Sequence, residues 1–228
     1  MTTAADVLAW LAAEDSPEAA AGNARYGLPT DVHGVPVGAM KAEAKRIGTD
    51  HALARALWAE GGHEPRMMAV FLADPAALTR AEADGWVRDI DNWAICDTAC
   101  FHLFDRTDWR WEPIRNWAGE EGEYVRRAAF AMLWALSTHD KAAPDARFTD
   151  HLDLFEAYAT DGRTYVKKAL DMALRAIGKR NAALNAAALE VAERLAVRDD
   201  PTARWIGRHV SAELTSAKVK ARLARSGI

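Results

Sequence analysis

Apolar residues recur with the period of an α-helix along almost the whole chain of 228 residues. Two stretches show the period most clearly. They begin at Tyr124-Val125-Arg126-Arg127 and, 41 residues later, at Tyr165-Val166-Lys167-Lys168. In each stretch the apolar residues fall at i, i+3, i+4, i+7 and i+11, which places them in one stripe on a helix. No segment alternates as a strand would, so the pattern predicts an all-α protein.

The spacing of the two copies predicts the architecture. A helix pair repeated at about 40 residues is typical of HEAT-type repeats, and a weaker third copy begins at Ala203-Arg204-Trp205. We therefore expect a curved α-solenoid of HEAT-like antiparallel helix pairs, with residues 1–228 as a single domain. The expected helices cover residues 3–13, 37–47, 50–59, 64–72, 79–88, 91–104, 122–138, 147–157, 164–178, 183–196, 201–212 and 215–225.

Composition excludes several classes of protein. Half of the residues are hydrophobic, which favours a packed core over disorder, and the chain holds only 14 Gly and 8 Pro. No run of about 18 apolar residues is present, so no membrane span is predicted. The first residues are acidic rather than basic, unlike a secretion signal. With Cys96 and Cys100 as the only cysteines, a reducing, cytoplasmic location is the simplest expectation.

Charge is distributed unevenly along the chain. Residues 161–228 hold 14 basic and 7 acidic side chains, whereas residues 1–160 hold 15 basic and 26 acidic ones, for a net charge of −4. A basic C-terminal third can present a positive surface to nucleic acid whatever the total charge. A solvated helical surface rich in arginine is the alternative interpretation, and charge alone favours it.

Residues 89–100, Asp-Ile-Asp-Asn-Trp-Ala-Ile-Cys-Asp-Thr-Ala-Cys, offer candidate chemistry. Cys96, Cys100 and His102 with Asp97 would supply metal-ligand atoms, but no second cluster completes a site and the cysteines lie among apolar residues. We expect two buried, inert cysteines, no metal and no cofactor. Motifs for a nucleophilic serine or for nucleotide phosphates are absent from the sequence.

Trp93 and Asp97 lie one helical turn apart and can be neighbours. In the simplest interpretation they are a core tryptophan beside a surface carboxylate. Residues off the apolar stripes give a second interpretation: Arg127, Ala131 and Trp134 align on one helix, and Lys168, Met172 and Arg175 on another. Together, an aromatic face, a carboxylate and cations are suited to recognising a cationic nucleotide. The carboxylate would stabilise the positive charge that develops on the sugar of that nucleotide.

The chain resembles the DNA alkylation repair proteins, the HEAT-like-repeat DNA glycosylases, over most of residues 20–225. The order and spacing of several short motifs carry the resemblance: Asn23-Ala24-Arg25-Tyr26-Gly27, Val35-Pro36-Val37-Gly38, Leu57-Trp58, His63-Glu64-Pro65-Arg66, Trp86-Val87, Asp91-Asn92-Trp93-Ala94-Ile95-Cys96-Asp97 and Arg126-Arg127-Ala128-Ala129. The resemblance implies an all-helical solenoid that holds duplex DNA on a basic concave face. It also implies a monofunctional hydrolase that cleaves the N-glycosidic bond of cationic N3- or N7-alkylated purines.

The resemblance assigns roles by position. Asp97 matches the catalytic carboxylate, Trp93 an aromatic packed on the deoxyribose, Arg127 a phosphate contact and Tyr26 an aromatic near the lesion. Met172 stands where active members carry a second tryptophan, and we expect this departure to affect rate and substrate range more than the fold. We further expect Lys168 and Arg175 to hold phosphates, and the protein to be a monomer.

The sequence is also compatible with two other functions. The first is a DNA-binding repeat protein with weak or no glycosylase activity that recognises distorted, branched or bulky-adduct DNA, which Met172 motivates. The second is a repeat scaffold that binds protein, which the acidic first 160 residues motivate.

Overall fold

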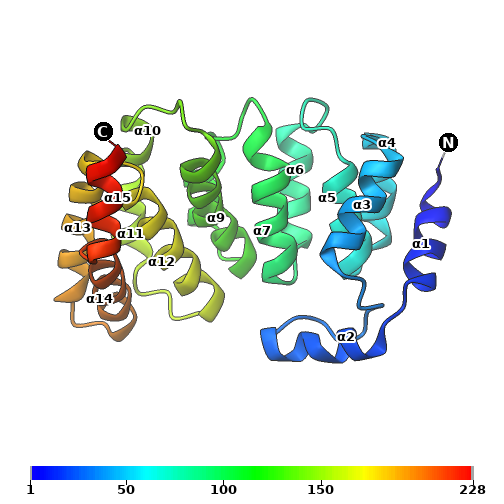
Figure 1. Cartoon of the computed structure of the whole chain (residues 1–228), viewed down its shortest axis with the longest axis horizontal. Coiled ribbons are helices and arrows are strands. Elements are labelled where there is room, and N and C mark those ends of the chain that lie inside the picture. The colour runs from blue at the N-terminus through cyan, green and yellow to red at the C-terminus, as the bar shows by residue number, and fades with distance from the viewer. Residues whose placement is uncertain (1, 227–228) are drawn as a thin grey trace. The chain divides into compact units, whose positions relative to one another are not determined.

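The computed structural model describes residues 2–226, and every regular element in that range is helical (Figure 1). The α-helices are α1 (Ala4–Ala13), α2 (Pro17–Gly22), α3 (Val37–Ile47), α4 (His51–Glu60), α5 (His63–Leu72), α6 (Arg80–Asp89), α7 (Trp93–His102), α8 (Ile114–Gly119), α9 (Glu123–His139), α10 (Ala146–Thr149), α11 (Leu152–Tyr158), α12 (Thr164–Gly178), α13 (Ala182–Ala196), α14 (Pro201–Leu214) and α15 (Ala217–Ser226). Two 3₁₀ turns are η1 (Asn23–Tyr26) and η2 (Phe104–Arg106). Within residues 2–226 no helix combines the length and apolar character that crossing a bilayer requires.

The predicted all-α fold is confirmed, and the bounds of α3 and α12 are those predicted. Helix starts follow ordinary capping rules. Asn181 precedes α13 and its side chain accepts a hydrogen bond from the amide of Leu184 at 2.8 Å. Asp200 caps α14 in the same way, with Pro201 at the first helical position.

One predicted helix is wrong in extent, and two short helices were not predicted. Residues 147–157 form α10 and α11 rather than one helix, because the backbone at His151 leaves the helical region. The imidazole Nδ1 of His151 donates to the carbonyl of Arg147 at 2.8 Å, and so takes an acceptor that a continuous helix would use. The six-residue helices α2 and α8 are too short to show a period.

Contacts between Cα atoms group the chain into two compact units, residues 1–110 and 111–228. The first unit holds α1 to α7 and the second holds α8 to α15. Repeat arrays divide readily in this way because each repeat contacts mainly its neighbours. The prediction that residues 1–228 form one domain therefore stays a prediction, and each unit is described by itself.

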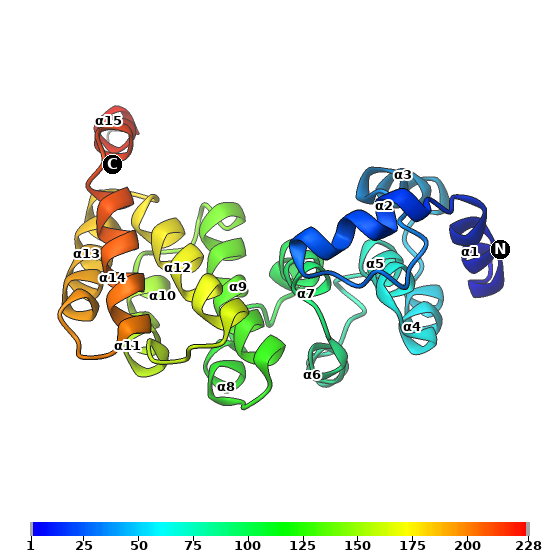
Figure 2. The ribbon, with the colours of Figure 1, turned by 90° about the horizontal axis from the view of Figure 1, so that it is seen from below.

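Successive helix pairs contact each other at regular spacings in sequence. In the first unit His51 pairs with Glu82, and Trp58 pairs with Asp89, both 31 residues apart. In the second unit the spacing is 38 residues, as in the hydrogen bond from His209 to Asp171. Helices α9 and α12 pack together, as do α12 and α14 (Figure 2). Equivalent positions of neighbouring repeats therefore touch, which is the packing of a HEAT-like array.

The apolar stripes predicted for α9 and α12 are buried, as expected. The prediction that Arg127 and Ala131 lie off the core is wrong, because their exposed fractions are only 3% and 1%. The cause is that α9 packs against both α8 and α12, so that two of its faces are covered. Trp134, the third member of that predicted group, is half-buried.

Candidate functional site

Helix α7 places Trp93 and Asp97 on one face. The helix begins at Trp93 because the buried side chain of Asn92 caps it, accepting hydrogen bonds from the amides of Ala94 and Ile95 at 3.1 Å each. Trp93 and Asp97 are both half-buried and lie one turn apart. Ile95, Cys96, Ala99 and Cys100 of the same helix are fully buried. The two side chains are therefore held on a fixed helix at the edge of the core.

The segment that leads into α7 is anchored from α4 and α5. The indole of Trp58 donates to the carboxylate of Asp89 at 2.9 Å, and the guanidinium of Arg66 donates to the carbonyl of Asp89 at 2.6 Å. The rings of Trp58 and Trp86 stack with centroids 4.3 Å apart. These contacts fix where α7 starts, and thus the position of Trp93.

Tyr26 lies beside Trp93. The Trp93 indole Nε1 donates to the carbonyl of Tyr26 at 2.9 Å, although 67 residues separate the two in sequence. The turn η1 ends at Gly27, whose φ of 65° is a left-handed conformation that glycine adopts without strain. The Tyr26 side chain is 67% exposed. The structure therefore brings Tyr26 into contact with Trp93 on the first unit, one helical turn from Asp97.

A buried glutamate holds the segment that follows this turn. Glu64 on α5 is 3% exposed, and its Oε1 accepts hydrogen bonds from the amides of Gly34 at 2.8 Å and Val35 at 3.3 Å. Gly34 has a φ of +76°, and a Cβ there would lie 2.5 Å from the carbonyl oxygen of Ser16. Glu64 thus fixes the chain between α2 and α3, which includes the Tyr26 turn.

The cysteines of α7 belong to the core. Cys96 and Cys100 are both fully buried, which confirms the prediction that they are packing residues. Burial, followed by the hydrogen bond with Cys96 and the charges of Asp97 and Asp105, raises the pKa of the Cys100 thiol well above its ordinary value. A neutral thiol is a poor nucleophile and metal ligand. Among residues 2–226 no group of three metal-binding side chains comes together.

The second unit carries the predicted cationic residues on α9 and α12. Arg127 is 3% exposed, and its guanidinium donates to the carbonyl of Tyr165 at 2.7 Å and lies 6.0 Å from the centre of that ring. Tyr165 also lies beside Tyr124, with ring centroids 5.8 Å apart. Arg127 therefore links α9 to α12. Its role as a phosphate contact stays a prediction.

Lys168, Met172 and Arg175 lie along α12 but differ in environment. Lys168 is exposed, with its ammonium 5.9 Å from the Tyr165 ring. Met172 is half-buried. The guanidinium of Arg175 forms ion pairs with Asp171, at 2.7 Å, and with Glu213. Two carboxylates balance the charge of Arg175, so Lys168 is the better of the two candidates for a phosphate contact.

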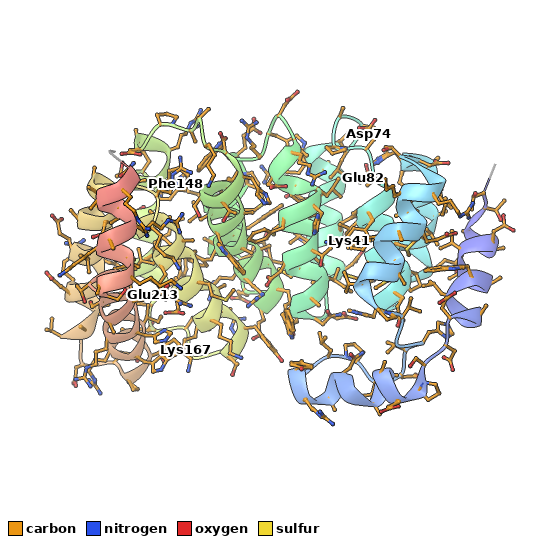
Figure 3. All side chains as sticks on the ribbon, in the orientation of Figure 1. Lys41, Asp74, Glu82, Phe148, Lys167 and Glu213 are labelled. Carbon is orange, nitrogen blue, oxygen red and sulfur yellow. The ribbon has the colours of Figure 1, made fainter. Side chains whose placement is uncertain are left out.

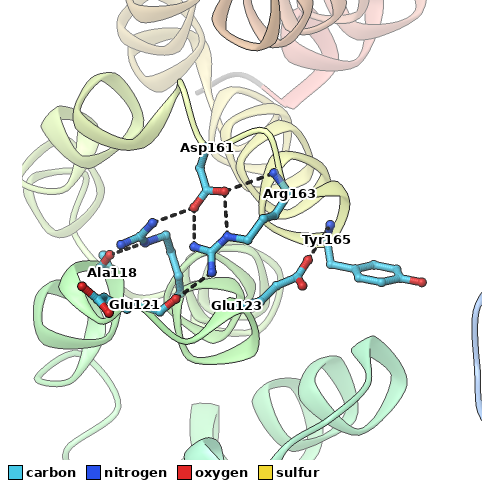
Figure 4. Close-up of polar contacts among 7 residues, drawn as sticks. Ala118, Glu121, Glu123, Asp161, Arg163 and Tyr165 are labelled. Atoms are coloured by element: carbon cyan, nitrogen blue, oxygen red, sulfur yellow. Dashed lines mark hydrogen bonds and ion pairs between the residues drawn. The ribbon is translucent and has the colours of Figure 1, made fainter.

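An ionic cluster joins the loop before α9 to the loop before α12. Asp161 accepts hydrogen bonds from Arg126 at 2.6 Å and from Arg163 at 2.5 Å, while Arg163 also donates to the carbonyl of Glu121 (Figure 4). Burial opposes ionisation of Asp161, but the bonds from Arg163 and Arg126 outweigh it and lower the pKa to about 2. The cluster fixes the helix starts that carry Arg127 and Lys168.

Sequence reasoning missed Trp205 and His209 on α14. Their rings stack with centroids 4.9 Å apart, and Trp205 is one of the few exposed large apolar side chains, at 40%. The weaker third repeat copy, which begins at Ala203-Arg204-Trp205, is the sequence signal that could have identified them. It places Trp205 one repeat after Lys167, and the two side chains are in contact in the structure.

Helix pairs that contact one another at a regular spacing define an all-α protein of HEAT-like repeats. The sequence model of the DNA alkylation repair enzyme family matches residues 7–210. The chain belongs to this family. A solved structure from a family described as related to the HEAT-like repeat DNA glycosylases, with affinity for branched DNA structures, has the same fold. The two align with a TM-score of 0.79 and 21% sequence identity over 97% of this chain and 96% of that chain. No curated protein sequence matches.

Proposed function

We propose that this protein is a DNA repair glycosylase that hydrolyses the N-glycosidic bond of cationic N3- and N7-alkylated purines in duplex DNA. The observation that supports it is the placement of Asp97 on α7, one turn from Trp93, whose indole binds the carbonyl of the exposed Tyr26, in a chain of the DNA alkylation repair family. A carboxylate one turn from an aromatic ring is suited to a positively charged sugar.

Asp97 would act on the sugar rather than on the base. When the glycosidic bond breaks, its electron pair leaves with the alkylpurine, which departs as a neutral base and needs no general acid. Positive charge develops on the deoxyribose as an oxocarbenium-like species. The Asp97 carboxylate stabilises this charge and orients a water molecule, which adds to C1′ and releases its proton to solvent.

Trp93 and Tyr26 would shape the space around the sugar and the lesion. The Trp93 indole is held by the carbonyl of Tyr26, so the orientation of its ring is set before DNA binds. The 67% exposure of Tyr26 leaves its ring available for contact with the DNA. A cationic nucleotide beside an aromatic face gains about 0.5–2 kcal/mol.

Lys168, Arg127 and Arg175 would contact phosphates from α9 and α12. Each phosphate neutralised by a cation releases condensed counterions, which makes the affinity depend on salt. Lys168 is exposed, whereas Arg127 and Arg175 already bind groups of the protein itself and would have to reorganise. We therefore assign the larger share of the salt dependence to Lys168.

The test is release of free base from duplex DNA that contains 7-methylguanine or 3-methyladenine. We expect the protein to release the alkylated purine and to leave an abasic site, at a rate above the spontaneous loss in the same DNA without protein. Release that does not exceed the spontaneous rate for either base, by protein that still binds the duplex, would refute the glycosylase proposal.

A second candidate function is a DNA-binding repeat protein with weak or no glycosylase activity that recognises distorted, branched or bulky-adduct DNA. Met172 favours it, because a thioether offers no aromatic face to a cation. The solved structure with the same fold comes from a family with affinity for branched DNA structures. Tight, salt-sensitive binding of a DNA junction without release of any alkylated base would support this candidate.

A further inference from the structure

Helices α12 and α14 run side by side (Figure 2). Three contacts join them, each between residues 38 apart in sequence. Lys167 and Glu213, which belong to the first and last of these contacts, are labelled in Figure 3. The ammonium of Lys167 lies 4.7 Å from the centre of the Trp205 ring. One turn further along both helices, His209 donates to Asp171 at 2.7 Å. After another turn Arg175 binds Glu213. The proposed function uses only Arg175 of these residues.

Trp205 and His209 form an aromatic platform on α14. They lie one turn apart, and their rings stack with an interplanar angle of 22°. The imidazole of His209 is fixed by Asp171, which is buried and is itself bound by Arg175 at 2.7 Å. The platform therefore has a set orientation, although 40% of Trp205 remains exposed.

The platform opens into a groove of about 430 Å³, which we call the Trp205 groove. Its lining residues are Pro201, Arg204, Trp205, Arg208, His209 and Ala212. Within residues 2–226, Arg208 and Lys167 form no ion pair with a carboxylate. The nearby acids Asp171 and Glu213 are already bound to cations of the protein. The groove is thus aromatic, partly apolar and positively charged.

We propose that the Trp205 groove binds an unpaired strand of DNA, with one base stacked on the Trp205 ring and the flanking phosphates held by Lys167 and Arg208. This inference rests on the proposed DNA-repair function for the identity of the ligand. Aromatic rings beside a track of cations are the usual means of binding single strands, because every base presents a flat face. A duplex keeps its bases paired and cannot offer one to the ring.

Lys167 has two roles in this arrangement. Without DNA its ammonium covers the ring, a contact at an exposed site that corresponds to about two- to fivefold in affinity. A base stacked on an aromatic side chain corresponds to about five- to 140-fold. The base therefore displaces the ammonium from the ring, and the flexible lysine side chain moves to the neighbouring phosphate. The Lys167 ammonium, displaced from the ring by the base, thus binds a phosphate of the same strand.

The test is fluorescence anisotropy of the full chain with a labelled oligothymidine single strand and with a duplex of random sequence. Trp205→Ala should lower the affinity for the single strand at least fivefold and the affinity for the duplex much less, while Trp205→Phe keeps most of the binding. Arg208→Gln should reduce the slope of log affinity against log salt by about 0.7 for the single strand. The matched control is Arg194→Gln on α13, which removes one charge from an exposed ion pair with Glu156 of α11.

The proposal is overturned if Trp205→Ala loses single-strand and duplex binding equally. It is also overturned if Arg194→Gln changes the salt slope as much as Arg208→Gln does. Competition by an acidic peptide as strong as that by oligothymidine of equal charge would also overturn it, because charge alone would then explain binding. Base release from methylated duplex is measured on the same variants. If the variants release base normally and Trp205→Ala binds the single strand as tightly as the wild type, the proposal for the Trp205 groove alone is refuted. If neither the wild type nor any variant releases base, the glycosylase proposal alone is refuted.

Discussion

The indole of Trp93 donates a hydrogen bond to the backbone carbonyl of Tyr26, which joins the first residue of α7 to a turn 67 residues earlier. One side chain thereby connects the helix that carries Asp97 with the exposed tyrosine. Because the acceptor is a main-chain atom, the contact fixes the turn and leaves the Tyr26 phenol ring accessible.

Replacement of Trp93 by Phe should loosen this turn without unfolding the protein. Phenylalanine keeps an aromatic face but has no donor for the Tyr26 carbonyl, which water can then satisfy because the turn is exposed. We expect the stability to fall by only about 0.5–1.5 kcal/mol. Amide hydrogen exchange of residues 23–28 should become faster, and base release slower. The control is Trp10→Phe, at a half-buried position on α1 of the same unit. If Trp10→Phe speeds exchange of residues 23–28 as much as Trp93→Phe does, the assigned role of Trp93 is contradicted.

Replacement of Asp97 by Asn tests the catalytic carboxylate. The amide has the same shape but cannot stabilise a positive sugar, and removal of one such group costs about 2.7–4 kcal/mol of barrier. We expect release of 7-methylguanine to slow by about 100- to 1000-fold. Affinity for the duplex should stay near that of the wild type, since phosphate contacts provide most of it.

The control for charge is Asp31→Asn, which removes an exposed carboxylate from the same unit. It should leave both release and binding unchanged. If Asp97→Asn releases base at the wild-type rate, Asp97 is not the group that stabilises the sugar, and the assignment based on family resemblance is wrong.

The sequence predicts the helices well where an apolar stripe is long and misses what depends on single side chains. Helix α12 has its predicted bounds because its stripe from Val166 to Ile177 faces a continuous core. The break at His151 was not predicted, since one imidazole bound to a carbonyl leaves no periodic signal. The burial of Arg127 depends on which helices flank α9, and local spacing does not contain that information.

The same limit applies to the candidate site. The one-turn relationship of Trp93 and Asp97 follows directly from their spacing in sequence. The contact between Trp93 and Tyr26 does not, because any residue provides a backbone carbonyl. Glu64 was noted only as part of a family motif, and the structure shows why a carboxylate is needed there: it accepts hydrogen bonds from two consecutive buried amides.

Replacement of Glu64 should destabilise the first unit according to how much acceptor capacity is lost. Glu64→Ala leaves the amides of Gly34 and Val35 without their acceptor, and each buried unsatisfied group costs about 1–3 kcal/mol. Glu64→Gln keeps one acceptor oxygen and should cost less. Urea denaturation followed by tryptophan fluorescence measures both variants. Equal destabilisation by the two substitutions would contradict this prediction, because Gln keeps both the side-chain volume and the acceptor oxygen that Ala lacks.

Substitution of Met172 by Trp distinguishes the two candidate functions. If the protein is a glycosylase limited by its missing aromatic contact, a tryptophan at this half-buried position should speed base release about three- to tenfold, as one added cation–π contact would. Ala176→Trp, also at a half-buried position on α12, controls for added bulk. If Met172→Trp binds DNA but releases no base above the spontaneous rate, a non-catalytic DNA-binding protein is the better description.

The Asp161 cluster predicts how the stability of the second unit depends on pH. The folded-state pKa of Asp161 is about 2, below its ordinary value of 3.8, because Arg163 and Arg126 stabilise the carboxylate against the effect of burial. A lowered pKa means that the stabilisation is complete above about pH 4 and is lost as the pH falls towards 2. It amounts to on the order of 1–2 kcal/mol, since Arg163 is partly exposed. Asp161→Asn should therefore be less stable than the wild type at pH 6, and the difference should shrink as the pH falls to about 2.

Thermal unfolding followed by circular dichroism at both pH values measures this difference, with Glu190→Gln on α13 as a control for loss of an exposed charge. A difference between Asp161→Asn and wild type that stays constant over this range would mean that the cluster contributes through packing and not through the charge of Asp161.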